Sequence, residues 1–346
     1  MILRLIVRLG IVALAAGAAL VPLPPGAIER WYSQGLYPAI QEQFTPATNQ
    51  IPIALLDVAI LAAIVFAAWR FARLRSGGFV RSIVSGAAGL ATSAALLYLV
   101  FMTLWGFNYR RVPLRDKIVH EPASVTDAAA RQFAGDAVAR LNALHGDAHH
   151  DSPAGPTLEQ AFASAQTRLG AKTTAVPGIP KRSVLEVYFR WAAIDGMTNP
   201  FFHEIIVNPD VLPTERPFVI AHEWAHLAGY AVESEASLLA WLTCRHGNAL
   251  AQYSGWMAMF GQVQAQLPPR EQRDLFARLE PGPRKDFAAI AARFARSQPM
   301  VRNVARDTYD VFLRANRVEA GISSYDEVVQ LILGGGAEHG WTPRLR

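Results

Sequence analysis

Two histidines and a glutamate stand at a spacing that suits a metal ion. His222 and His226 are four residues apart, and Glu223 directly follows the first histidine. Residues four apart lie on one face of an α-helix, one turn above the other, so both imidazoles can bind one zinc ion. Glu223 can then reach a zinc-bound water, whose pKa the metal lowers toward about 7, and act as its general base. The pattern predicts a zinc hydrolase site.

The segment that follows offers the third protein ligand that a catalytic zinc requires. Gly229 can end the metal helix and turn the chain, and Glu233 and Glu235 then open a second helix with apolar residues at helical spacing. Two residues apart on a helix, these glutamates point to different faces, so we expect only one to bind the metal. The other is expected to interact with the helix dipole or to orient a histidine.

The composition restricts both the class of protein and the ligands available. Apolar residues make up 51% of the 346 residues and charged residues 18%, which favours a membrane protein. The net charge of +5 includes no long basic run, so we expect no nucleic-acid partner. Cys244 is the only cysteine, which excludes an internal disulfide and a cysteine zinc cluster. A metal site must therefore use histidines and carboxylates.

Three apolar stretches predict membrane-spanning helices at about residues 2–23, 51–69 and 83–105. For the first, a cleaved signal peptide is the alternative, but no clean cleavage site of small residues follows it, so we expect a membrane anchor. The second contains one acid, Asp57, which we expect at the membrane interface because it stands near the start of the span.

Basic residues between the last two spans predict the orientation. This loop carries four arginines and no acid: Arg70, Arg73, Arg75 and Arg81. Loops rich in Lys and Arg stay in the cytoplasm, so the chain after residue 108 is expected outside it. We therefore predict a transmembrane region at 1–107 and an extracytoplasmic metallohydrolase domain at 108–346.

The domain at 108–346 reads as mainly helical with a small sheet. Helices are predicted from about Ser124 to Leu144 and from Leu158 to Leu169, and short strands at 183–189 and 202–207. The second strand can pair with an extended peptide or with an internal strand. Residues 145–156 read as a loop, in which His149-His150-Asp151 is interpreted as solvated, because a flexible segment does not preorganise a metal site.

Several motifs resemble those of a family of bacterial membrane proteins, domain of unknown function 3810. They are Trp105-Gly-Phe-Asn-Tyr109, the HEWAHLAG run 222–229, Glu233-Ser-Glu-Ala236, Tyr253-Ser-Gly255, Tyr309-Asp-Val-Phe-Leu-Arg-Ala-Asn316 and Gly321-Ile-Ser-Ser-Tyr325. The chain departs from that pattern at Ser237 and Arg314, where the family has Asn and Lys. The resemblance covers nearly the whole chain and implies a multi-pass protein of the bacterial inner membrane. The family has no established substrate.

The metal motif also resembles that of the gluzincin peptidases. In several of these the third ligand is the Glu of an E-x-x-A segment, which implies Glu233 here; the gap from His226 is shorter than in many gluzincins, so Glu235 stays open. The resemblance implies a zincin-like α+β domain, a zinc metallopeptidase activity and a peptide or protein substrate. Peptidases of this kind add a residue that stabilises the oxyanion, for which the candidates are Tyr253, Tyr309, Tyr325 and His203.

Two other functions compete with a membrane-anchored metallopeptidase. A non-catalytic zinc-binding membrane protein with a regulatory or binding role is the main alternative, although a closed structural site has no need of Glu223. A transporter is less favoured, because three spans with a single acid, Asp57, offer little polar lining.

Overall fold

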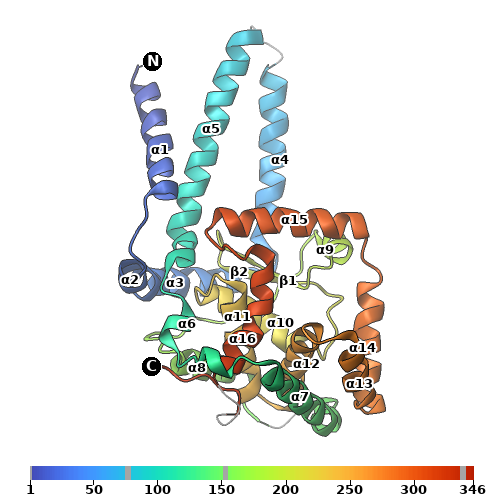
Figure 1. Ribbon diagram of the computed structural model, residues 1–346. Helices are drawn as coiled ribbons and strands as arrows, with labels where there is room; N and C mark the ends of the chain where they lie inside the picture. The colour runs from blue at the N-terminus through green and yellow to red at the C-terminus, as the bar shows by residue number, and fades with distance from the viewer. Residues whose placement is uncertain (1, 75–78, 151–154, 336–339) are drawn as a thin grey trace.

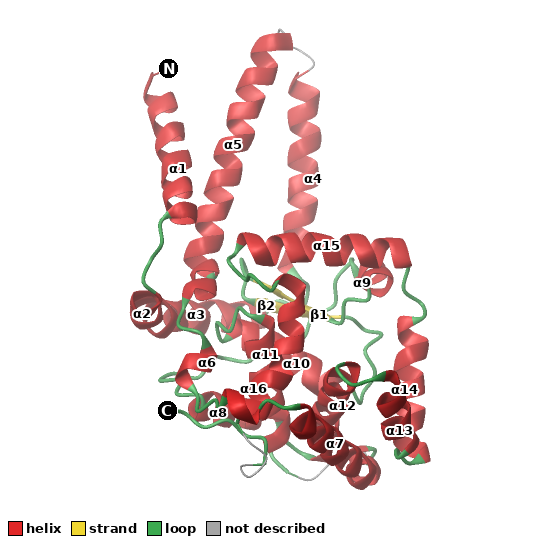
Figure 2. Cartoon of the chain, in the orientation of Figure 1, coloured by secondary structure: helices red, strands yellow, loops and turns green. Residues whose placement is uncertain are grey.

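Three long apolar helices rise from one side of a helical body (Figure 1, Figure 2). They are α1 (Ile2–Leu20), α4 (Leu55–Leu74) and α5 (Phe79–Leu104). The structure is a computed structural model that describes residues 2–74, 79–150, 155–335 and 340–346. Large apolar side chains on these helices are exposed, among them Ile64 and Leu90. Such a surface suits apolar surroundings better than water.

One of these helices, rather than the three predicted, is long and apolar enough to be a membrane span among the described residues. It is Ile2–Leu20, whose place near the N-terminus also fits a signal sequence. The apolar helical stretches described in the other two, Leu55–Trp69 and Ala88–Leu104, are shorter than the about 20 residues that a bilayer crossing needs. The prediction of three spans is therefore corrected to one candidate span.

The structure does not describe the side chains of the four arginines on which the predicted orientation depends. Arg75 lies outside the described residues, and so do the side chains of Arg70, Arg73 and Arg81. The predicted orientation therefore stays a prediction.

The segment between α1 and α4 folds against the body through α2 (Pro25–Ala27), the π-helix η1 (Ile28–Leu36) and α3 (Tyr37–Asn49). Within α3, the buried Gln41 side chain donates to the carbonyl of Val176 at 2.7 Å and accepts from its N–H at 2.9 Å. These bonds satisfy a buried amide group on both of its ends. The connection is thus part of the folded body.

Most of the body is helical. Its elements are η2 (Gly106–Arg110), α6 (Leu114–Lys117), η3 (Pro122–Ser124), α7 (Asp127–Ala148), α8 (Leu158–Arg168), α9 (Glu186–Ala192), β1 (Gly196–Asn199), β2 (Glu204–Val207), α10 (Arg216–Leu227), α11 (Glu233–His246), α12 (Ala249–Ala265), α13 (Pro269–Ala277), α14 (Pro281–Phe294), α15 (Pro299–Ala315), η4 (Gly321–Asp326) and α16 (Glu327–Gly334). Helix α11 is buried from Glu233 to Cys244 and packs against α8, α10, α12 and α16. A helix buried on all sides forms the centre of a core.

The sheet has two strands, β1 and β2, which run antiparallel with Gly196 opposite Val207. The other edge of β2 is also occupied, because Lys181 donates its N–H to Ile205 at 3.0 Å and accepts that of Val207 at 3.1 Å. Strand β2 confirms part of the strand predicted at 202–207. Its two partners, β1 and Lys181, belong to the same chain. The predicted strand at 183–189 is wrong, because α9 begins at Glu186.

Local side-chain contacts explain that error and the extent of the predicted helices. Glu186, in the first turn of α9, accepts the guanidinium of Arg182, which precedes the helix, at 2.6 Å. An acid in the first turn of a helix interacts favourably with the helix dipole. Helix α7 has Thr126 as its N-cap, two residues after the predicted start at about Ser124, and continues past Leu144 to Ala148. The loop predicted from residue 145 therefore starts one turn too early. Helix α8 confirms the prediction at 158–169 and begins with a capping box at Thr157.

Two carboxylates fasten the first turn of α4 to the body. Glu204 of β2 accepts the N–H groups of Leu55 and Leu56 at 2.9 Å each, and the buried ammonium of Lys181 at 2.9 Å. Asp57 accepts the Ser183 hydroxyl at 2.6 Å. Free N–H groups at a helix start need such partners. The base of α4 is thereby fixed next to the strand that precedes the metal helix.

Candidate metal centre

Helix α10 carries the predicted metal motif and ends where a glycine turns the chain. Pro217 occupies its first turn, and His222, Glu223 and His226 follow on the helix. Gly229 then adopts a φ of 83°, and a Cβ at this position would meet Asn108 and Tyr37 at 3.1 Å. A left-handed backbone in such a narrow space favours glycine. The turn leads directly into α11, which begins at Glu233, as the sequence predicts.

The structure brings His222, His226 and Glu233 together. The Nε2 atoms of the two histidines lie 3.2 Å apart, and Glu233 Oε2 lies 3.0 Å from that of His222 and 3.4 Å from that of His226. Ligands at about 2.0–2.1 Å from a tetrahedral zinc ion lie about 3.4 Å from one another. The three atoms thus have the separations that a zinc site needs.

Hydrogen bonds to the other ring nitrogens orient the imidazoles. His226 Nδ1 lies 2.8 Å from the carbonyl oxygen of Tyr230, which can only accept, so Nδ1 carries a proton. His222 Nδ1 lies 3.3 Å from the hydroxyl of Ser237. Partners of this kind are typical of metal-binding histidines and leave Nε2 free for the ion.

The site brings a carboxylate and two imidazoles together away from solvent. Burial by itself would raise the pKa of Glu233, but the two imidazoles hold it well below its usual range. Burial opposes the charged form of His226, yet the Glu233 carboxylate raises its pKa to about 9. A buried carboxylate that faces two imidazoles therefore requires a compensating cation, either a proton or a metal ion. The donor set fits a divalent transition metal.

Glu235 lies apart from this group. Its carboxylate accepts the N–H of Leu114 at 2.6 Å and therefore fixes the start of α6 to α11. The structure thus places Glu233, and not Glu235, beside the two histidines.

Strand β1 supports Glu223, a contact that sequence reasoning missed. The Thr198 hydroxyl donates to Glu223 Oε2 at 2.8 Å, and a Cβ at Gly196 would lie 2.7 Å from Glu223 Oε1. The two strand residues are two apart and so face the same side. The Gly-x-Thr spacing was the only sequence signal. Burial raises the pKa of Glu223.

Two of the four candidate oxyanion residues reach the site. Tyr309 of α15 donates a hydrogen bond to Glu233 Oε1. Tyr325 of η4 lies near the Glu233 charge and stacks on the ring of His222, with centroids 6.2 Å apart. Burial, together with the nearby Glu233 charge, raises the pKa of both phenols well above the usual range, so they stay protonated.

The other two candidates lie elsewhere. Tyr253 donates to Asp286 at 2.7 Å. His203 is buried between the rings of Tyr37 and Phe44, with centroids 5.7 Å and 5.4 Å away.

An aspartate joins the elements that carry the two tyrosines. Asp310 accepts the N–H of Ile322 at 2.9 Å and the Arg314 guanidinium at 2.7 Å. Gly321 has a φ of 56°, and any Cβ there would collide with the Asp310 carboxylate. Asp310, which follows Tyr309, and Gly321, which begins the motif that ends at Tyr325, thus hold α15 and η4 together.

The last carbonyls of α10, and that of Gly229 in the turn after it, accept hydrogen bonds from residues in the N-terminal part of the chain. Trp105 donates its indole N–H to the carbonyl of His226 at 2.9 Å, Tyr37 donates to that of Leu227 at 2.8 Å, and Arg111 to that of Gly229 at 3.1 Å. These bonds satisfy carbonyl groups that a helix end leaves free. They connect the metal helix to the end of α5.

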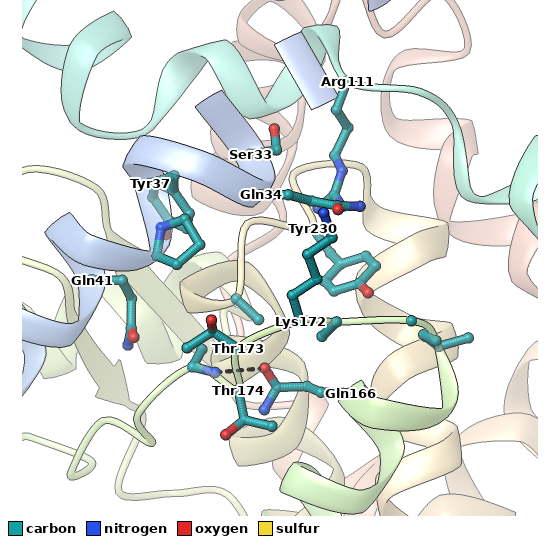
Figure 3. A pocket seen from close by; sticks show the side chains of 16 residues that line it. Ser33, Gln34, Tyr37, Gln41, Arg111, Gln166, Lys172, Thr173, Thr174 and Tyr230 are labelled. Carbon is teal, nitrogen blue, oxygen red and sulfur yellow. Dashed lines mark hydrogen bonds between the residues drawn. The ribbon is translucent and has the colours of Figure 1, made fainter. Parts of the chain in front are cut away.

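A separate pocket lies beside the turn that follows α10 (Figure 3). Its polar lining includes Gln34, Arg111 and Lys172. It includes neither the metal-site histidines nor Glu233. This pocket is therefore distinct from the candidate metal centre.

Comparison with known proteins identifies a family and no activity. A family model described as "Protein of unknown function (DUF3810)" matches residues 32–333. No curated protein and no solved structure matches the chain.

The separations at the site predict that Glu233 and not Glu235 binds the metal. In protein loaded with zinc and dialysed against a weak chelator, Glu233→Gln should lose one bound zinc ion, because it removes a charged ligand. Glu235→Gln should retain it, since its carboxylate faces Leu114. The measurement is the zinc-to-protein ratio by elemental analysis, and the reverse order of losses would reassign the third ligand.

Proposed function

We propose that this chain, which belongs to the DUF3810 family, is a membrane-anchored, zinc-dependent metallopeptidase with a gluzincin-like centre. The description of the family assigns no activity, so the proposal rests on the site. The observation that carries the proposal is the convergence of His222, His226 and Glu233 within 3.0–3.4 Å of one another. Glu223 lies beside them on the same helix. An arrangement of three ligands and a neighbouring base is the minimum set for hydrolysis by an activated water.

In this proposal Glu223 acts as the general base. A zinc ion bound by the three ligands would supply the Lewis acid that makes the attacking water acidic near neutral pH. Glu223 accepts the proton of that water and passes it to the leaving amine. Thr198 fixes one carboxylate oxygen at 2.8 Å, which orients the base. A pKa raised by burial favours a carboxylate that takes up a proton near neutral pH.

The two tyrosines have different roles. Tyr309 donates to the Glu233 oxygen that faces away from the histidines, so it positions the ligand. Tyr325 stacks on the ring of His222, the ligand that directly precedes Glu223 on α10. In this proposal its hydroxyl would lie where the oxyanion of an attacked carbonyl forms. We assign oxyanion stabilisation to Tyr325.

A peptide is the preferred substrate because of strand β1. Gly196 and Thr198 of this strand contact the base directly. Among the described residues β1 pairs with β2 only, so its second edge has no strand partner. An extended peptide can add to such an edge through main-chain hydrogen bonds. That placement would hold a scissile bond beside Glu223.

Only α1 meets the length and hydropathy of a span among the described residues, but α4 and α5 are 20 and 26 residues long as whole helices, and we further propose that they accompany α1 into the bacterial inner membrane. All three helices leave the body on the same side (Figure 1), and their described surfaces are rich in exposed apolar residues. Figure 1 shows that the C-terminal end of α4 and the N-terminal end of α5 are remote from the body, and the sequence around these ends contains four arginines. Since such loops stay in the cytoplasm, the body would lie outside it.

The activity is tested with Glu223→Gln. This variant should keep its zinc, because Glu223 is not a ligand, and should lose hydrolysis of a broad peptide library by about 10²–10⁴-fold. The measurements are zinc content and cleavage products by mass spectrometry. Full activity in the variant would remove Glu223 from the base role. A zinc-loaded wild type that cleaves no peptide would favour the alternative, a non-catalytic zinc-binding protein.

The role of Tyr325 is tested with Tyr325→Phe. The substitution keeps the ring that stacks on His222 and removes the donor, so kcat should fall by about 10²–10³-fold with the zinc content unchanged. Tyr188→Phe, at a half-exposed position on α9, is the matched control and should behave as wild type. An unchanged kcat in Tyr325→Phe contradicts the assignment.

The orientation is tested by labelling introduced cysteines. The native Cys244 is buried and should not react. In spheroplasts, a membrane-impermeant maleimide should label Glu159→Cys on α8 and should label Ser76→Cys in the α4–α5 connection only after lysis. The opposite pattern would reverse the proposed topology.

A further inference from the structure

We propose a second metal site, formed by His145 and His149 of α7 and Asp286 of α14, that binds a divalent transition metal such as zinc. It shares no residue with the candidate centre on α10 and does not depend on the proposed activity. One ligand atom from each of the three residues lies within 4.8 Å of the others. The sequence motif containing Tyr253, which has no part in the first site, contributes here.

The separations suit a metal ion. Asp286 Oδ2 lies 3.4 Å from His149 Nε2 and 3.6 Å from His145 Nε2. The two imidazole rings are one helical turn apart, with their centroids 4.2 Å from each other. Donor atoms around a tetrahedral zinc ion lie about 3.4 Å apart, so only a small movement would close the site.

The ligands are already oriented by their surroundings. His149 Nδ1 lies 2.8 Å from the carbonyl oxygen of His145, so Nδ1 carries the proton and Nε2 presents its lone pair toward Asp286. The hydroxyl of Tyr253 donates to Asp286 at 2.7 Å, and its side chain is fully buried. The tyrosine ring meets both imidazoles edge-on, with centroids 5.9 Å and 5.8 Å away. Supporting partners of this kind are typical of metal ligands.

The backbone of α14 also lies directly against the His145 ring. Gly282, in the first turn of α14, lies against the imidazole so closely that a Cβ would come within 2.5–2.7 Å of three ring atoms. Side chains cannot approach that closely, and only glycine leaves the space. The position of the ring is therefore fixed by the helix that supplies Asp286.

A bound metal explains this group better than ion pairs alone. One carboxylate faces two imidazoles, and two charged rings 4.2 Å apart would repel each other. A single metal ion can accept the lone pairs of two neutral imidazoles and balance the charge of the carboxylate. The group is also accessible, because the side chains of His145 and His149 are 30% and 39% exposed. Two nitrogen ligands and one oxygen ligand suit zinc and its neighbours in the first transition row.

The site would connect α14 to α7. At its other end, α14 is held by Arg293, which pairs with Asp195 and Glu215 at 2.6 Å each. A metal at Asp286 would fasten the N-terminal end in the same way. Because α15 follows α14 and carries Tyr309, the metal stabilises the segment that completes the first site.

The experiment counts bound zinc in the full-length protein in detergent. Metal-stripped samples are equilibrated at a buffered free zinc concentration in the micromolar range, and the zinc-to-protein ratio is measured by elemental analysis. With both candidate groups intact, the wild type should bind two zinc ions. His149→Ala and Asp286→Asn should each lose one. His150→Ala, at the exposed neighbouring histidine, is the matched control and should lose none.

Further variants separate this site from the first. His222→Ala should retain one zinc ion, and the double variant His149→Ala/His222→Ala should retain none. Zinc should raise the Tm of His222→Ala and leave that of the double variant unchanged, because only a metal that binds the folded state stabilises it. Equal zinc contents in wild type, His149→Ala and Asp286→Asn overturn the proposal. A single zinc ion that survives His222→Ala and is lost in Asp286→Asn supports it and rejects the first site instead.

Discussion

The structure depends on a carboxylate, that of Glu233, which is buried at the first turn of the most enclosed helix of the body. A buried charge is tolerated only when it is paired and hydrogen-bonded. The dipole of α11 contributes some positive potential at this end. Two imidazoles from α10 and two phenols from α15 and η4 complete the surroundings of the carboxylate. Three other elements, α10, α15 and η4, therefore meet at one side chain of α11.

The position of α10 follows from that requirement and is secured from its other end. Its histidines face α11, while its last carbonyls accept hydrogen bonds from Tyr37 and Trp105, and the following turn accepts one from Arg111. Glu29 in turn holds Arg111 at 2.9 Å and Lys117 at 3.0 Å. Residues from the first third of the chain thus support a motif that lies more than one hundred positions later. This long-range support gives the segment between α1 and α4 a structural role.

The sequence was informative where local rules decide the outcome. The helix of His222, the turn at Gly229 and the start of α11 at Glu233 all follow from periodicity and from the freedom of glycine. The sequence did not separate Glu233 from Glu235, because tertiary packing decides which face of α11 meets α10. The contacts of Thr198 and Gly196 with Glu223 depend on a strand that has no strong pattern of its own.

The loop prediction at residue 145 shows the limits of composition. Gly146 and the polar residues after it indicate a loop, yet α7 continues to Ala148 and places His145 and His149 one turn apart. Packing of α7 against α12 and α14 stabilises this last turn beyond its own propensity. The structure describes one candidate membrane span where the sequence predicts three. The second predicted span also begins too early, because α4 starts only at Leu55, where Glu204 accepts its first N–H groups.

The hydrogen bond from Trp105 to His226 has a mechanical consequence. Trp105 directly follows α5, so the end of this helix and the backbone of the metal helix are joined by one rigid indole. A shift of α5 along its axis would have to carry His226 with it or break the bond. If α5 enters a bilayer as proposed, this bond would hold the candidate metal centre at a constant height above the lipid. A polypeptide anchored in the same bilayer would then meet the site at one fixed distance from the point where it leaves the lipid.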